Sequence, residues 1–177
     1  TLGFTKSFHL QLRFIITYLL IALLVVVLWY FLPVFSLIIF LLVSIVHFGC
    51  GDLIWKNNRF YYISGYVHGG LVVLGIIFFN KDEVDHLFSI LSGNQLYLLW
   101  QFLYVALLIW ILSLILILFN YKKITFSKNY IKLLTVMVLV ISLFPPLPAF
   151  AIYFCLVHSI HHFKRIIPTL LNFMEKK

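Results

Sequence analysis

Three histidines lie close together in the apolar segment "YFCLVHSIHHF", residues 153–163. His158 and His162 are four residues apart, so on a helix their imidazoles share one face and can reach one metal ion. At 3.6 residues per turn, His161 lies about 60° from His158, on the side away from His162. We interpret His161 as a residue that orients a ligand or lies at the membrane interface. Neutral imidazole suits Fe, Zn, Cu or Ni, so this segment predicts a metal site.

A second polar motif, "SIVHFGCGD", provides His47 as the expected third ligand. Gly49 and Gly51 lack side chains, which lets a neighbouring backbone or a bulky ligand approach closely. Asp52 has two interpretations. It orients a ligating imidazole through a hydrogen bond, or it is a solvated residue at the helix end beside Lys56.

The remaining histidines fall into two groups, one inside the apolar stretches and one outside them. His68, counted along its helix, lies at the same depth as the metal-site histidines, all within about 15 Å of one boundary. We keep it as a candidate for the surroundings of the site. His9 and His86 lie outside the apolar stretches and are expected to be ordinary interfacial residues. The simpler alternative is that each buried histidine only hydrogen-bonds to nearby carbonyl groups.

Composition indicates where these residues are held. Of the 177 residues, 64% are hydrophobic and 10% are charged, which is typical of an integral membrane protein. We predict an all-α integral membrane protein, with residues 1–177 as one transmembrane helical domain and 80–94 as a short interfacial helix. Since a span needs about 20 apolar residues, we expect about six transmembrane helices. They are 14–31, 34–51, 60–79, 95–119, 130–145 and 147–163.

The net charge of +8 is a topology signal. If six spans start from the cytoplasm, 12 of the 13 basic residues fall on the inner side and only Lys81 lies outside. We therefore predict a multi-pass protein of the cell (inner) membrane with both termini in the cytoplasm and no nucleic-acid partner. Cys50 and Cys155 lie in apolar runs, so we expect no disulfide.

Two membrane enzyme families carry comparable histidine motifs. "HSIHH" matches one HxxHH box of the fatty-acyl desaturases and hydroxylases, which need about eight histidines in three boxes. The chain more closely resembles the Brp/Blh family of membrane carotenoid oxygenases. The resemblance rests on an HFGxxD motif, His47 to Asp52, and on a signature near FAxYFxxxHSxxH, Phe150 to His162. It extends over most of the chain, including "GGLVVLGIIFFNKDEVDHLFSIL" between the motifs.

The resemblance implies a β-carotene 15,15'-dioxygenase that uses non-haem Fe(2+) held by four histidines. Such an enzyme cleaves β-carotene with O₂ at its central double bond to give two retinal molecules. By this resemblance, His47, His158 and His162 match the family's metal ligands. We expect Phe150, Tyr153 and Phe154 to line an apolar substrate tunnel. A non-catalytic alternative is a carotenoid- or retinal-binding protein, or one that assists opsin assembly, and a functional link to an opsin fits either interpretation.

One family feature has no counterpart in this chain. Family members carry an earlier histidine in an HGxxD-type motif, whereas His9 is followed by Leu10. We expect the fourth ligand to lie in a missing N-terminal helix, consistent with a chain that starts at Thr1 rather than Met. Alternatively, His68 completes the set.

Overall fold

The computed structural model describes residues 2–52, 60–93, 96–120 and 128–174, and every element in these ranges is helical. This confirms the predicted all-α class. The elements in chain order are α1 (Leu2–Phe31), α2 (Pro33–Asp52), α3 (Tyr61–Phe79), α4 (Lys81–Ser92), α5 (Tyr97–Phe119), α6 (Lys128–Leu143), α7 (Pro146–Tyr153), the π-helical turn η2 (Phe154–His158) and α8 (Ser159–Met174). Pro33 and Pro146 each stand at a helix start, where the fixed φ of proline is favourable.

Four of the described helices are long and apolar enough to cross a membrane. They are Phe8–Phe31, Pro33–Asp52, Tyr61–Phe79 and Tyr97–Phe119. They correspond to the first four predicted spans. The fifth predicted span has a shorter apolar helix, Ile131–Leu143, and the sixth is shared among α7, η2 and the start of α8. The count of six spans therefore stays a prediction.

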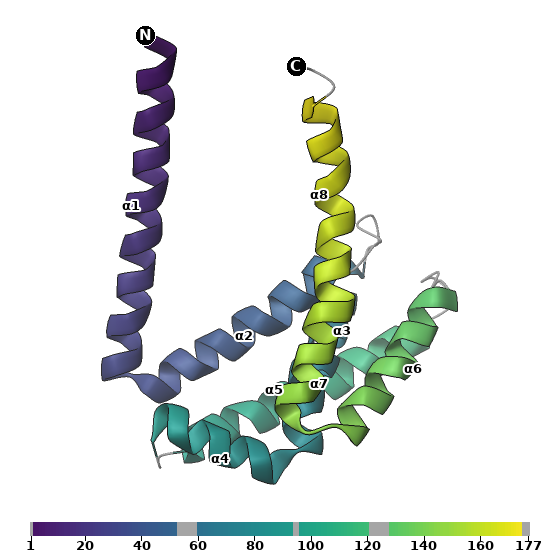
Figure 1. The fold of residues 1–177 in the computed structure, drawn as a ribbon. Helices are drawn as coiled ribbons and strands as arrows, with labels where there is room; N and C mark the ends of the chain where they lie inside the picture. The colour runs from purple at the N-terminus through teal and green to yellow at the C-terminus, as the bar shows by residue number, and fades with distance from the viewer. Residues whose placement is uncertain (1, 53–59, 94–95, 121–127, 175–177) are drawn as a thin grey trace.

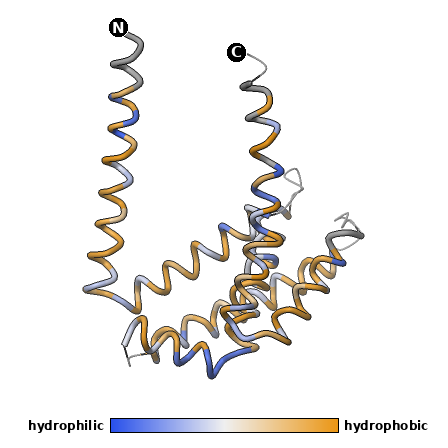
Figure 2. Tube along the Cα trace, in the orientation of Figure 1, coloured by the Kyte–Doolittle hydropathy of each residue, from blue (hydrophilic) through white to orange (hydrophobic). Residues whose placement is uncertain are grey.

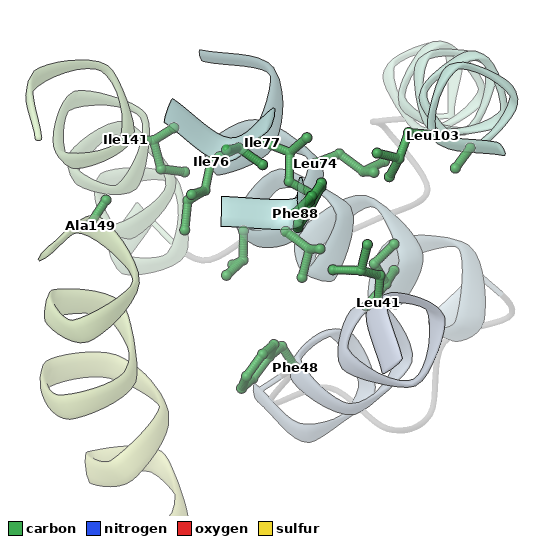
Figure 3. Close-up of a cluster of buried hydrophobic side chains, with 14 of the residues drawn as sticks. Leu41, Phe48, Leu74, Ile76, Ile77, Phe88, Leu103, Ile141 and Ala149 are labelled. Atoms are coloured by element: carbon green, nitrogen blue, oxygen red, sulfur yellow. The ribbon is translucent and has the colours of Figure 1, made fainter. Parts of the chain in front are cut away.

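The helix α3 lies at the centre of the packing and contacts α2, α4, α5, α6 and α7. Its buried side chains Val72, Leu74 and Ile77 belong to the main apolar core, which Figure 3 shows together with residues of α2, α4, α5, α6 and α7. In contrast, α1 stands apart along most of its length (Figure 1). Apolar residues cover long stretches of α1, α2 and α5 (Figure 2), and many of their side chains are exposed, as lipid-facing surfaces are.

The short helix α4 is attached to its neighbours by polar contacts. The Trp100 indole N–H donates to the Asp85 carboxylate at 2.6 Å, and the Lys81 ammonium donates to the Tyr104 hydroxyl at 2.8 Å. The second hydrogen bond raises the pKa of Lys81 above its usual value. The Trp29 indole N–H of α1 donates to the Leu91 carbonyl at 3.1 Å. The segment predicted as an interfacial helix is thus a helix that is held against two long ones.

Glycines allow α2 and α3 to approach at backbone distance. A Cβ atom placed on Gly69 would lie 1.9 Å from the Ile45 carbonyl oxygen, and one on Gly49 would lie 2.0 Å from the Gly65 carbonyl oxygen. No side chain fits in either place. Small residues commonly permit such approaches in membrane proteins. This contact fixes where the end of α2, which carries His47 and Asp52, lies relative to α3.

We predict that Gly69→Ala destabilises the protein by at least about 2 kcal/mol, because its methyl group must push two backbones apart. Gly75→Ala on the same helix is the matched control. Its Cβ would meet the end of the Ile141 side chain at 3.4 Å, an ordinary contact. Thermal unfolding of the two purified variants in detergent measures the difference. Equal melting temperatures would show that the close contact is not needed.

Candidate functional site

A buried carboxylate lies at the end of α2. Asp52 is 4% exposed, and the hydroxyl of Tyr153 donates a hydrogen bond to its Oδ2. The Nδ1 atom of His158 lies 3.1 Å from Oδ1 and 3.2 Å from Oδ2. Since a carboxylate accepts hydrogen bonds, Nδ1 is the nitrogen that carries the hydrogen, and in the neutral imidazole Nε2 then keeps the lone pair. Of the two interpretations of Asp52, the geometry supports the one in which it orients an imidazole.

The three histidines predicted as metal ligands are neighbours in the structure. The ring centroid of His158 lies 5.2 Å from that of His47 and 6.3 Å from that of His162. His158 is buried, whereas His47 and His162 are exposed. Within the described ranges, no group of three or more His, Cys, Asp or Glu side chains is already arranged to hold a metal ion. The ligand assignment therefore stays a prediction.

His68 and His161, the two other histidines near this cluster, are both less exposed than His47 and His162. His68 is 1% exposed, its ring centroid lies 6.3 Å from that of Tyr153, and it interacts electrostatically with Asp52 and His161. His161 is half-buried. His161 is thus more buried than the neighbouring His162, a difference that the sequence pattern did not predict. His9 on α1 and His86 on α4 are both exposed, as expected of interfacial residues.

An apolar groove of about 760 Å³ runs beside the histidines. This volume lies within the range of about 300–1,000 Å³ that is usual for ligand sites. The residues that line the groove come from α2, α3, α4, α7 and η2: Phe40, Leu41, Val43, Ser44, His47, Phe48, Val73, Ile76, Ile77, Val84, Leu87, Phe88, Ile90, Leu91, Pro146, Leu147, Phe150 and Phe154. His47 belongs to this lining and is the link between the groove and the imidazole cluster.

The aromatic residues predicted to line a tunnel fall in two places. Phe150 and Phe154 line the groove. Tyr153 is not among the lining residues, because its side chain turns to Asp52 and is fully buried. The sequence signal that could have separated them is helical phase, since Phe150 and Phe154 are four apart and share a face.

Phe48 lies between the groove and the polar cluster. Its ring meets Phe150 on the groove side at 5.8 Å, and it packs edge-to-face against Tyr153 at 5.4 Å and His158 at 5.1 Å. Edge-to-face contacts of this kind add to the packing beyond simple burial. Phe48 thereby holds the site residues and the groove wall in one arrangement.

Comparison with known proteins places the chain in a family. The chain matches the family model "Beta-carotene 15,15'-dioxygenase" over residues 2–177. The chain belongs to this family. It is also 36% identical over 165 residues to a protein named "Beta-carotene 15,15'-dioxygenase" from uncultured marine bacterium 66A03. No solved structure matches the chain.

The family membership confirms the resemblance drawn from the two histidine motifs and disfavours the desaturase alternative. The aligned region covers 92% of this chain and 59% of the marine relative. The chain thus spans about three fifths of the length of that relative.

Proposed function

We propose that the protein is a carotenoid-cleaving dioxygenase that acts on β-carotene at its central double bond and releases two retinal molecules. The observation that carries the proposal is the apolar groove, which reaches His47, whose ring lies 5.2 Å from that of His158. The name of the marine relative, a beta-carotene 15,15'-dioxygenase, supports the same activity.

The groove suits a hydrocarbon substrate. β-Carotene has no polar group, so a protein can position it only by shape and by apolar contact. Ser44 and His47 are the polar residues of the lining, and the Ser44 hydroxyl already donates to the Phe40 carbonyl of its own helix at 2.8 Å. The lining therefore offers a polyene van der Waals contact along its length and an imidazole at one place.

The donor set fits iron(II), the metal that we propose. His47, His158 and His162 would hold it, with His68 as the alternative further ligand on this chain. The fit rests on the Asp52 hydrogen bond, which leaves the Nε2 lone pair of His158 available for a metal. Neutral imidazoles suit iron. When bound, iron(II) supplies the one-electron chemistry that allows O₂ to react with a closed-shell polyene.

The overall reaction balances without a further reactant. The O=O bond and the central C=C bond both break, and each of the two carbon atoms receives one oxygen atom as an aldehyde. The four electrons that O₂ gains come from the substrate double bond, so neither a reductant nor a nucleotide cofactor is needed. The role of the chain is to hold the central bond near the histidines and to exclude water.

The reaction would take place in the cell (inner) membrane, because both β-carotene and the exposed helix surfaces are apolar. We propose that both termini are cytoplasmic, as the distribution of basic residues indicates. The start of α1 and the end of α8 point to the same side (Figure 1), which supports the part of this proposal that places both termini on one side of the membrane. A functional partnership with an opsin that binds the released retinal stays a proposal.

The activity can be tested in membranes of cells that accumulate β-carotene. We expect production of the intact protein to yield about two moles of retinal per mole of β-carotene lost, as chromatography would measure. Unchanged β-carotene in the presence of folded, iron-loaded protein would contradict the proposal. Pigment recovered unchanged with the protein, together with no metal, would favour the non-catalytic carotenoid-binding alternative.

The ligand assignment makes a separate prediction. Replacing His47, His158 or His162 with Ala should lower iron content and retinal formation together, by at least about tenfold, because each removes a neutral donor. His86→Ala, at an exposed position on α4, is the control and should retain both. Elemental analysis of the purified variants measures the iron. Retention of iron in both His158→Ala and His162→Ala would refute the metal assignment.

A bulky side chain in the groove should block the substrate and spare the metal. Leu87 on α4 lines the groove and is half-buried. We expect Leu87→Trp to reduce retinal formation by about tenfold or more, because the larger ring occupies part of the groove and the substrate then loses apolar contacts with the lining. The iron content should stay that of the wild type. Leu98→Trp, at an exposed position on α5 outside the groove, is the control. Equal activity of the two variants would show that the substrate binds elsewhere.

A further inference from the structure

The structure breaks its regular α-helical geometry at the site. Residues Phe154–His158 form the π-helical turn η2, in which the backbone N–H of Ser159 bonds to the carbonyl of Phe154, five residues earlier. The Ser159 hydroxyl donates to the same carbonyl at 2.9 Å. Single π turns inside α-helices hold one extra residue and occur frequently at functional sites.

This turn determines which side chains of the helix share a face. Tyr153 and His158 are five residues apart, so on a regular α-helix they would diverge by about 140°. In a π turn, residues five apart take the stacked positions that residues four apart have in an α-helix. Both side chains reach the carboxylate of Asp52, and the single ring of Phe48 contacts both.

We propose that η2 aligns Tyr153 and His158 on the Asp52 carboxylate, and that Asp52 and Tyr153 are positioning residues that orient His158 for metal binding. This inference rests on the proposed metal centre. Tyr153 holds one carboxylate oxygen, and His158 bonds to both oxygens of the same group. The Tyr153 hydroxyl therefore fixes the carboxylate, and the carboxylate fixes the imidazole.

A positioning role for Asp52 and Tyr153 and a simple packing role predict different effects of substitution on metal affinity and on stability. A carboxylate that orients a ligating imidazole typically contributes 10- to 100-fold to metal affinity. A residue that only fills space would change the stability of the metal-free protein and leave the affinity of the folded protein as it was. Metal affinity and metal-free melting temperature, measured on the same samples, separate the two roles.

The test uses the intact protein in detergent, titrated anaerobically with iron(II) against a chromogenic chelator. We expect Asp52→Asn and Tyr153→Phe each to raise the dissociation constant by about 10- to 100-fold. The double variant should be no weaker than Asp52→Asn alone, because the two residues act as one unit. The matched control is Tyr61→Phe, whose hydroxyl donates at 2.9 Å to the Cys50 carbonyl near the same end of α2.

The alignment of Tyr153 with His158 across η2 can be tested by changing the length of this turn at Leu156, which is 63% exposed. Deleting Leu156 should convert the turn to α-helix and leave the tyrosine and histidine four apart, on one face, with iron affinity within about threefold of the wild type. Inserting one alanine after Leu156 should separate them and abolish tight binding. A deletion variant that misfolds, or folds without binding iron, contradicts the alignment.

The results also separate this inference from the metal centre itself. Wild-type affinity in His158→Ala would overturn the proposed metal centre. Loss of iron in His158→Ala, with wild-type affinity in both Asp52→Asn and Tyr153→Phe, would overturn the positioning role alone. If Asp52→Asn does not fold, Tyr153→Phe decides, because it removes one hydroxyl and keeps the ring.

Discussion

The buried carboxylate of Asp52 is the constraint on which the rest of the site depends. An ionised group inside an apolar helical protein costs several kcal/mol unless hydrogen bonds compensate it. Asp52 is 4% exposed, and its partners Tyr153 and His158 both come from the last helical segment. The close approach of α2 to α3 at Gly69 places the end of α2. The carboxylate then determines where the segment from α7 to α8 must lie.

The site combines two environments that are chemically opposite and directly adjacent. On one side of Phe48 lie a carboxylate, a phenol and imidazoles, and on the other lies a groove whose lining is almost wholly apolar. A polar cluster beside the bilayer would attract water, whereas a hydrocarbon substrate requires a dry surface. Phe48 lies where these demands meet and contacts His158 with its ring edge-to-face. Hydrogen bonds from Tyr153 and His158 satisfy the Asp52 carboxylate within the cluster, while His47 is the member of the cluster that lines the groove.

The sequence predicted the features that depend on distance along the chain. Apolar runs located the helices, and counting from their ends placed His47, His158 and His162 at one depth. The sequence alone could not predict features that depend on how one helix is rotated and packed against another. The role of Asp52 stayed undecided because it depends on the contact between α2 and the last segment. The π turn was missed because the helical pattern assumed 3.6 residues per turn. Tyr153 was assigned to the groove because the three aromatic residues were grouped by their nearness in the chain and not by their helical phase.

Stability and function draw on the same interactions in this chain. Lipid solvates apolar side chains as well as a protein core does, so burial alone does not hold helices together in a membrane. Close packing and interhelical hydrogen bonds take over this role. Between α3 and α5 they are Trp110 to the Val67 carbonyl and Tyr66 to the Ala106 carbonyl. Between α2 and the last segment, the corresponding hydrogen bonds are those of Asp52. The polar contacts that order the candidate site are therefore also the ones that attach the last segment to the helical core, and a substitution there acts on both.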